Sequence, residues 1–171
     1  NDAAYAQVSY DGFSHPSLMQ VPGAAERALE FHSLSKMFNM TGWRLGFAAG
    51  CPEAIENLAK LKSNLDSKQF MALSVAGAFA LRSADNREAL GLYRRRRDIL
   101  VGGLRDLGWN VPLPKATFYV WAPVPKGFDS MSLATDLLER AHIVCIPGIG
   151  YGEAGEGYVR MSLTVDADRE G

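Results

Sequence analysis

The sequence predicts an α/β fold, because apolar runs of strand length alternate along the chain with longer segments of helical spacing. No internal repeat and no low-complexity run interrupts this pattern, which excludes solenoids and disordered tails. The composition is typical of a globular protein: of 171 residues, 47% are hydrophobic and 22% are charged. We therefore expect folded material with a core of its own.

The charge balance and the cysteine count exclude several functional classes. A domain that binds nucleic acid usually carries an excess of positive charge, whereas the formal net charge of this chain is −1. The uncharged, largely apolar stretch Phe70–Leu81 is too short to span a bilayer, and no basic segment followed by an apolar stretch opens the chain. Cys51 and Cys145 are expected to be thiols in a reducing cytoplasm. We expect a cytoplasmic protein that binds neither membranes nor nucleic acid.

The first half of the chain is expected to hold two strands and two helices. Glu30–Ser33 is predicted as a short strand, and a loop follows it through Gly42. Trp43–Ala49 has the apolar character of a buried strand and ends at a Gly-Cys-Pro turn. A helix is predicted over Glu53–Lys62. A second one over Lys68–Leu81 is apolar enough to be buried.

The longest predicted helix runs from about Asn86 to Leu107, with Asp85 as its cap and Gly108 as a left-handed stop. Its apolar side follows spacings of three and four: Leu90, Tyr93, Arg97, Leu100, Val101, Leu104 and Leu107. The four consecutive arginines 94–97 fan around the helix axis instead of forming one basic stripe. We therefore expect them to be solvated or paired with carboxylates.

Beyond this helix the pattern is that of a small α+β unit. It contains predicted strands over Thr117–Trp121, Ile143–Ile146 and Tyr158–Leu163, and a predicted helix over Ser132–Arg140. A domain boundary within the long helix (86–107) would give domains of residues 1–95 and 96–171. An Asp followed by acidic residues at 166–170 is typical of a helix N-terminus, so we expect this chain to be part of a longer protein.

The segment from Phe31 to Gly46 carries the chemistry. Lys36 follows a predicted strand and two serines, and Arg44 comes eight residues later. The rim of an open α/β sheet is where such proteins bind ligands. Hydroxyls and a guanidinium suit a phosphate, and a lysine near another cation suits condensation with an aldehyde. From the residues alone, the segment is either a site for a phosphorylated aldehyde or an ordinary strand and turn.

This segment resembles the lysine motif of the pyridoxal-phosphate-dependent aminotransferases of class I/II, which have fold type I. The resemblance covers essentially the whole chain. Residues 1–5 resemble the family's Asp-x-x-Tyr stretch, and residues 151–163 resemble its C-terminal substrate-arginine motif. Residues 62–67 and 114–121 are most similar to bacterial LL-diaminopimelate aminotransferases. The implied architecture is the end of the large-domain mixed sheet with its helices, followed by a small, truncated C-terminal α+β domain.

The resemblance assigns catalytic and cofactor-binding roles to five residues. Lys36 would bind pyridoxal 5'-phosphate covalently and, once released by the substrate, would move a proton between the substrate Cα and the cofactor C4′. Asp2 would keep the pyridine nitrogen protonated, which maintains the ring as an electron sink. Tyr5 would donate a hydrogen bond to the phenolic oxygen. Ser33 and Arg44 would hold the phosphate.

The same resemblance assigns the substrate contacts. Arg160 would bind the substrate α-carboxylate as a bidentate pair, since a guanidinium within an apolar strand needs an anion. Asn64 would lie near the cofactor and substrate, and Ser35 is a lesser candidate for the phosphate. No metal site is expected, because the histidines show no ligand spacing: His15, His32 and His142. The glycines at 148–157 are expected to allow sharp turns near Arg160.

The resemblance implies a ping-pong transfer of an amino group between an amino acid and a 2-oxo acid, in a homodimer. LL-diaminopimelate synthesis for lysine is the first candidate. A broader aspartate- or alanine-type aminotransferase is the second, and the effector domain of a transcription regulator is an alternative of another class. The family's second phosphate-binding loop and its ring-stacking aromatic residue lie upstream of this chain. We therefore expect these 171 residues alone to bind the cofactor weakly and to turn over poorly.

Overall fold

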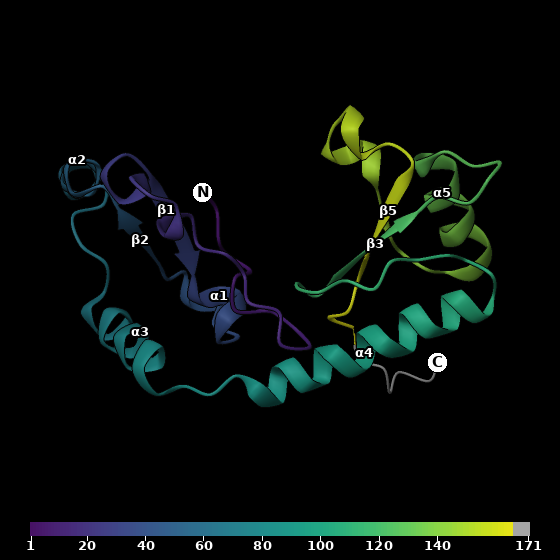
Figure 1. Ribbon diagram of the computed structural model, residues 1–171, viewed down its shortest axis with the longest axis horizontal. Helices are drawn as coiled ribbons and strands as arrows, with labels where there is room; N and C mark the ends of the chain where they lie inside the picture. Colours follow the sequence, from purple (N-terminus) through teal and green to yellow (C-terminus); the bar gives the residue numbers. More distant parts are fainter. Residues whose placement is uncertain (166–171) are drawn as a thin grey trace. The chain divides into compact units, whose positions relative to one another are not determined.

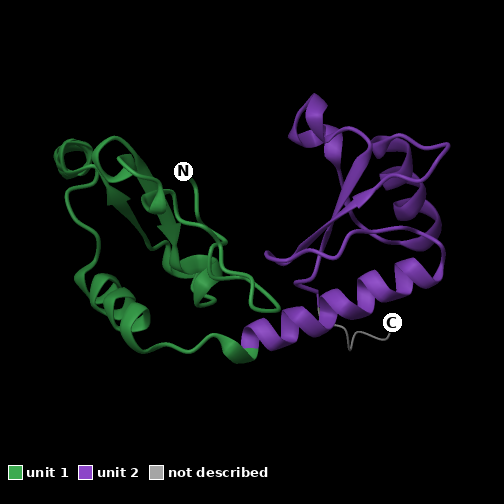
Figure 2. Ribbon diagram, viewed as in Figure 1, with its two compact units in different colours: residues 1–88 green, residues 89–171 purple. Residues whose placement is uncertain are grey.

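The computed structural model describes residues 1–165 and divides the chain into two compact units, Asn1–Glu88 and Ala89–Gly171 (Figure 2). The division lies at the start of the long helix α4 (Arg87–Asp106). The domain boundary at 95/96 expected from the sequence lies further along the same helix, and this domain assignment stays a prediction. The predicted acidic helix start at 166–170 lies outside the described residues.

The first unit is built around an antiparallel pair of strands, β1 (Leu29–Ser33) and β2 (Gly46–Gly50) (Figure 1). The register pairs Leu29 with Gly50 at one end and Ser33 with Gly46 at the other. The strands are joined through α1 (Leu34–Met37) and a 3-10 turn over Thr41–Trp43. After β2 come α2 (Pro52–Leu65) and α3 (Met71–Ser83), and two 3-10 turns precede β1, at Leu18–Gln20 and Ala24–Glu26.

Two expectations for the segment between the strands are wrong. The predicted loop after Ser33 begins with the short helix α1, because the Ser33 side chain caps it by accepting a hydrogen bond from the Ser35 backbone. The predicted buried strand Trp43–Ala49 begins only at Gly46, and its residues are partly exposed. Arg44 has a left-handed backbone with φ of 51°, which interrupts an extended chain at that point.

The core of the first unit joins the strand ends to α3. Leu34, Met40, Leu45 and Ala80 form a buried cluster. Gly77 of α3 lies so close to it that a Cβ there would be 2.3 Å from Leu45 Cδ2. The small side of α3 therefore packs against the residues that flank the lysine motif.

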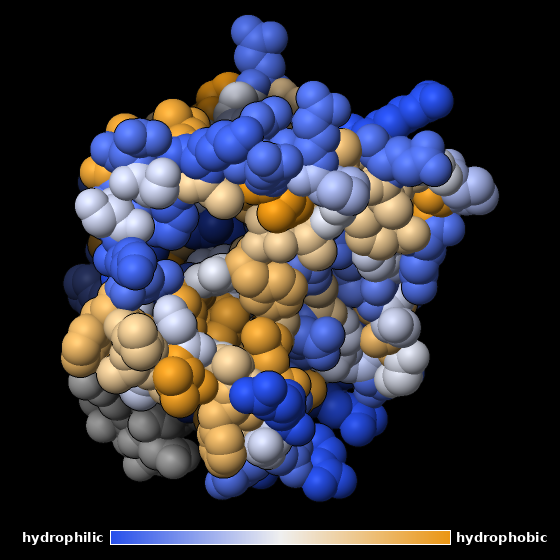
Figure 3. All heavy atoms as spheres, turned by 90° about the vertical axis from the view of Figure 1, so that its left-hand side faces the viewer, coloured by the Kyte–Doolittle hydropathy of each residue, from blue (hydrophilic) through white to orange (hydrophobic). Residues whose placement is uncertain are grey.

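The expected burial of α3 is wrong for most of its length. Only Gly77 and Ala80 are buried, whereas Val75 and Phe79 are 63% and 65% exposed. The helix is apolar on all sides, but the described part of the first unit covers only its small-residue side. Figure 3, which views the side to the left in Figure 1, shows apolar side chains at that surface.

The second unit is a three-stranded antiparallel sheet of order β3-β5-β4, with α5 (Ser130–Ala141) against it (Figure 1). Its strands are β3 (Tyr119–Pro123), β4 (Ile146–Pro147) and the central β5 (Tyr158–Ser162). Period-two alternation separates its two faces. Val120 and Ala122 of β3 and Val159 and Met161 of β5 are buried. The intervening residues of both strands lie on the other face.

Two strands of the second unit begin later than predicted. Thr117 has a left-handed backbone with φ of 67°, so β3 starts at Tyr119. His142 closes α5 with φ of 57°, and β4 is confined to Ile146–Pro147 instead of covering residues 143–146. The predicted helix over 132–140 is confirmed and extended, because Asp129 and Ser132 form a capping box before it.

The long helix α4 is confirmed almost to the residue. The Asp85 side chain accepts a hydrogen bond from the Arg87 backbone at 2.9 Å, and Gly108 ends the helix with φ of 82°. Of the four consecutive arginines, Arg97 is buried and pairs with Asp98 at 2.7 Å, as expected of a guanidinium that packs on the apolar side. Within residues 1–165, every helix is too short or too polar to cross a membrane.

We predict opposite stability effects for one substitution at two helical glycines. Gly77→Ala forces a methyl group into the Leu34–Leu45 contact, and the overpacking, roughly 1–3 kcal/mol, outweighs the gain in helix propensity. Gly91→Ala is the matched control in α4, because a Cβ there meets nothing within 4 Å. It should stabilise the protein by about 0.5–1 kcal/mol. Urea unfolding measures both changes, and an equal gain from the two variants would contradict the packing of α3.

Candidate active site

The lysine predicted to react lies where β1 passes into α1. Ser33 is the last residue of the strand, and Lys36 lies within the single turn of helix that follows it. Both side chains are half-buried. Among the described residues, none forms a hydrogen bond or ion pair with the Lys36 amine. The turn therefore fixes the backbone of Lys36 and leaves its amine unengaged by the residues that the structure describes.

The arginine predicted to hold a phosphate is brought back to the same strand end. The backbone N–H of Leu34 donates a hydrogen bond to the Leu45 carbonyl at 3.0 Å, just beyond the pairing of Ser33 with Gly46. Arg44 precedes this link and is exposed; its Nη1 donates to the Thr41 carbonyl at 3.0 Å. The antiparallel pairing thus places the backbones of Ser33 and Arg44 on neighbouring segments of the chain.

The N-terminal segment with Asp2 and Tyr5 runs beside β1. Asp2 forms a parallel bridge with Phe31, through Phe31 N–H to Asn1 O at 2.9 Å and Ala3 N–H to Phe31 O at 2.8 Å. The Asp2 carboxylate is exposed and accepts a hydrogen bond from the Ala4 backbone at 3.1 Å, which starts a turn. Tyr5 lies half-buried within that turn. The N-terminal segment with Asp2 and Tyr5 is therefore attached to β1, the strand that leads to Lys36.

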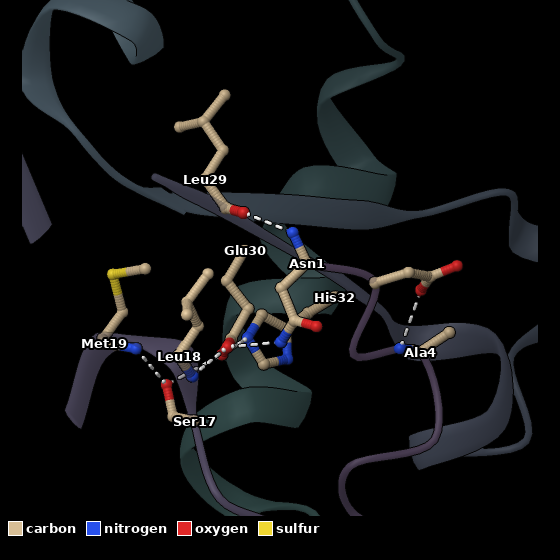
Figure 4. A network of polar contacts seen from close by, with 9 residues as sticks. Asn1, Ala4, Ser17, Leu18, Met19, Leu29, Glu30 and His32 are labelled. Atoms are coloured by element: carbon tan, nitrogen blue, oxygen red, sulfur yellow. Dashed lines mark hydrogen bonds and ion pairs between the residues drawn. The ribbon is translucent and has the colours of Figure 1, made fainter. Parts of the chain in front are cut away.

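The sequence reasoning missed the buried carboxylate that fastens this segment. Glu30 is 2% exposed in the middle of β1 (Figure 4). Its oxygens accept four hydrogen bonds, from Leu18 N at 2.7 Å and, each at 2.9 Å, from Asn1 Nδ2, Ser17 Oγ and His32 Nε2. Burial alone raises the pKa of Glu30, but these bonds, led by that from Asn1, outweigh it and lower the pKa to about 2. The available signal was an acidic residue between the apolar Leu29 and Phe31 of a strand.

His32 supports this arrangement from the same strand. Its ring stacks on Phe47 of β2 at a centroid distance of 4.7 Å, and its Nε2 contacts Glu30. These contacts give His32 a role in packing and in holding the Glu30 carboxylate. Among the described residues, no group of three or more His, Cys, Asp or Glu side chains could hold a metal ion.

The donor set at the end of β1 fits a phosphorylated aldehyde. The Lys36 amine is unpaired among the described residues, as condensation with a carbonyl requires. Ser33 and the exposed Arg44 supply a hydroxyl and a planar cation, the groups that bind phosphate. Ser35, by contrast, is 5% exposed, and its carbonyl accepts a hydrogen bond from Thr41 Oγ1. Its burial favours a role in packing.

The candidate carboxylate-binding arginine belongs to the second unit. Arg160 lies on β5, on the face opposite the buried Val159 and Met161. It is half-buried, with its guanidinium carbon 4.1 Å from the ring centre of Tyr119 and 4.9 Å from that of Tyr151. Within the described residues, no carboxylate pairs with it. The guanidinium is thus held by aromatic rings and keeps its capacity to bind an anion.

Arg160 lines an open pocket of about 540 Å³. The other lining residues are mostly aromatic or apolar: Pro112, Pro114, Thr117, Tyr119, Trp121 and Tyr158. One cation in an apolar wall suits a small organic acid. Asn64, the other predicted substrate contact, is exposed on α2, and its amide donates to the Lys60 carbonyl at 2.8 Å. That bond is local to the helix and indicates no ligand.

The whole chain matches one family of known proteins. The model of the aminotransferases of class I and II covers residues 1–170. The chain is 51% identical to an LL-diaminopimelate aminotransferase of Moorella thermoacetica and 52% identical to that of Halothermothrix orenii. Each match covers 99% of this chain and 44% of the relative, so the chain spans less than half the length of these curated relatives.

Solved structures agree with this match. An aminotransferase from Staphylococcus aureus is 34% identical, with a TM-score of 0.89 over 96% of this chain and 44% of that one. The aromatic aminotransferase from Pyrococcus horikoshii is 31% identical, with a TM-score of 0.88 over 96% of this chain and 46% of that one. The expected α/β architecture of fold type I is therefore confirmed.

We predict that the Glu30 network makes stability depend on acidic pH. The pKa of Glu30 is lowered from 4.5 to about 2, so its stabilisation is present above pH 4.5 and is lost as the pH falls towards 2. Glu30→Gln should cost about 2 kcal/mol at neutral pH, because charge-assisted hydrogen bonds are lost.

The check is the free energy of unfolding of both proteins from neutral pH to pH 2. The difference between them should shrink below pH 4.5, and this isolates Glu30 from other carboxylates with lowered pKa values, such as Asp85. A difference that stays constant across this range would contradict the network.

Proposed function

Since the chain belongs to the aminotransferases of class I and II, we propose that its protein transfers an amino group between an amino acid and a 2-oxo acid. Members of this family depend on pyridoxal phosphate and act on amino and oxo acids. The observation that carries the proposal is the Lys36 amine just after β1, which has no partner among residues 1–165, with Ser33 at the end of β1 and Arg44 just before β2.

Five residues of the first unit would hold the cofactor, with Tyr5 at its phenolic oxygen. Lys36 would bind its aldehyde carbon, and Ser33 and Arg44 would bind its phosphate. Asp2 would bind its ring nitrogen, which is supported by the bridge of Asp2 to Phe31 on the strand that leads to Lys36. When bound, the cofactor supplies an electron sink for the bond to be broken at the substrate Cα.

The chain's own residues would bind, orient and move protons. The Asp2 carboxylate would hold a positive charge on the ring nitrogen, and Tyr5 would donate a hydrogen bond to the cofactor's phenolic oxygen. The Lys36 amine would take the proton from the substrate Cα as a general base and deliver it, as a general acid, to the carbon of the cofactor's former aldehyde group. Arg160 would bind and orient the substrate carboxylate. Asn64 would lie near the substrate.

The substrate pair is proposed from the relatives. Several curated relatives at about half identity are LL-diaminopimelate aminotransferases. We therefore infer that glutamate donates the amino group and that tetrahydrodipicolinate accepts it, which gives LL-diaminopimelate for lysine synthesis. We further propose that the protein is a cytoplasmic homodimer. A transamination assay of the full-length protein with glutamate and a panel of oxo acids, the cyclic precursor included, tests the pair directly.

Lys36→Ala should reduce transamination by at least about 10²–10⁴-fold, because both the covalent anchor and the general base are lost. The matched control is Lys60→Ala, since Lys60 is exposed on α2 and pairs with Glu56 of the same helix, at 3.0 Å. The rate of oxo acid formation measures both variants. Activity retained in Lys36→Ala would remove this lysine from the mechanism.

Arg160→Ala should raise KM roughly 30-fold or more for every substrate with an α-carboxylate, because a charged hydrogen-bonded pair is lost. Arg160→Lys keeps the charge but not the planar fork of donors, so its KM should lie between those of wild type and the Ala variant. Steady-state kinetics with the amino acid and the oxo acid measure this. An unchanged KM would overturn the role of Arg160.

A further inference from the structure

The guanidinium of Arg160 sits in a built aromatic cluster within the second unit. Tyr119 and Tyr151 both contact it, at 4.1 and 4.9 Å. Behind them, Trp121 packs edge-on against Tyr151 at 5.7 Å and stacks on Tyr158 at 5.5 Å. Tyr119, Trp121 and Tyr158 lie on strands of the sheet, whereas Tyr151 lies on the glycine-rich loop. One of the two rings on Arg160 thus depends on how this loop is held.

The glycine-rich loop comprises residues 148–157. Its shape depends on the close approach of two glycine backbones, Gly148 and Gly155. A Cβ at Gly148 would lie 1.9 Å from the Gly155 carbonyl oxygen, and one at Gly155 would lie 2.2 Å from that of Gly148. Between them, Gly152 has φ of 105°, a backbone conformation that other residues rarely adopt. No larger side chain fits at these contacts without moving the backbone. The turn that presents Tyr151 therefore has a defined shape.

A network of hydrogen bonds between the exposed Glu156 and the buried Ser130 fastens the same loop to the start of α5. The Glu156 carboxylate accepts hydrogen bonds from Ser130 N at 2.8 Å, Ser130 Oγ at 2.7 Å and Gly157 N at 2.8 Å. Ser130 is fully buried, and its Oγ also accepts a hydrogen bond from Ile149 N at 3.3 Å. Both ends of the loop are thereby tied to one serine.

We propose that Tyr151 is a positioning residue, held by the Ser130–Glu156 network, that keeps the Arg160 guanidinium ready to bind a substrate carboxylate. This inference rests on the proposed function and deepens it. A long arginine side chain samples many rotamers, and ordering it on binding lowers affinity. An aromatic ring attracts the cation without neutralising it as a carboxylate would. The N–H donors that match a carboxylate therefore remain available.

The experiment compares Tyr151→Leu with Tyr151→Phe in the full-length protein loaded with its cofactor. Two readouts are used: KM and kcat for the amino acid and the oxo acid, and calorimetric binding of glutarate, a dicarboxylate with no amino or oxo group to react. Loss of the ring in Tyr151→Leu should weaken glutarate binding and raise both KM values about 2- to 30-fold, with kcat changed less. Tyr151→Phe keeps the ring and should restore wild-type values within about twofold.

Glu156→Gln tests the network without touching the ring. The amide replaces one acceptor oxygen by a donor, so the loop is held less firmly and KM should rise in the same direction as in Tyr151→Leu. Circular dichroism establishes that each variant is folded. If Tyr151→Leu and Tyr151→Phe bind glutarate equally, or if only kcat falls, the positioning role is wrong. A wild-type protein that binds glutarate but transfers no amino group would instead contradict the proposed function and leave this test standing.

Discussion

The backbone hydrogen bond from Leu34 N–H to the Leu45 carbonyl, at 3.0 Å, closes the antiparallel pairing of β1 and β2, and the first unit's site depends on it. On one side of it, the chain turns through Ser33 into the helical turn that carries Lys36. On the other, the left-handed Arg44 turns into β2. Both leucines that it joins are buried against Gly77 and Ala80 of α3. Core packing therefore fixes the backbone that carries Lys36 relative to the backbones of Ser33 and Arg44.

In the second unit, a β-sheet instead of a turn positions the functional side chain. Alternation along β5 buries Val159 and Met161 and leaves Arg160 on the opposite face, where aromatic side chains surround it. A half-buried guanidinium without a carboxylate partner in the described chain is held by ring contacts, which stabilise the cation at modest energy. The N–H donors of the Arg160 guanidinium therefore remain available to bind an anion. In both units the backbone around the functional side chain is fixed. The Lys36 amine and the Arg160 guanidinium have no carboxylate partner among the described residues.

Much of this arrangement could be predicted from the sequence, for identifiable reasons. Helix α4 followed from its spacing, its Asp85 cap and its Gly108 stop, all of which are local signals. The late start of β2 could not be predicted, because the left-handed backbone of Arg44 leaves no mark in residue type. The exposure of Phe79 on α3 could not be predicted either. The apolar composition of the helix favours burial but does not indicate which of its sides packs against the rest of the unit. The roles of Glu30 and Tyr151 depend on partners distant in sequence, which periodicity does not reveal.

The central claim is that the β1–α1 junction presents the one lysine that reacts with the cofactor's aldehyde. Borohydride reduction of the full-length protein after incubation with pyridoxal phosphate, followed by peptide mass mapping, tests it most directly. We expect a single stoichiometric label on Lys36, whose amine is unpaired within the described chain, and none on ion-paired lysines such as Lys62. A label spread over surface lysines, or an unlabelled Lys36 peptide, would contradict it.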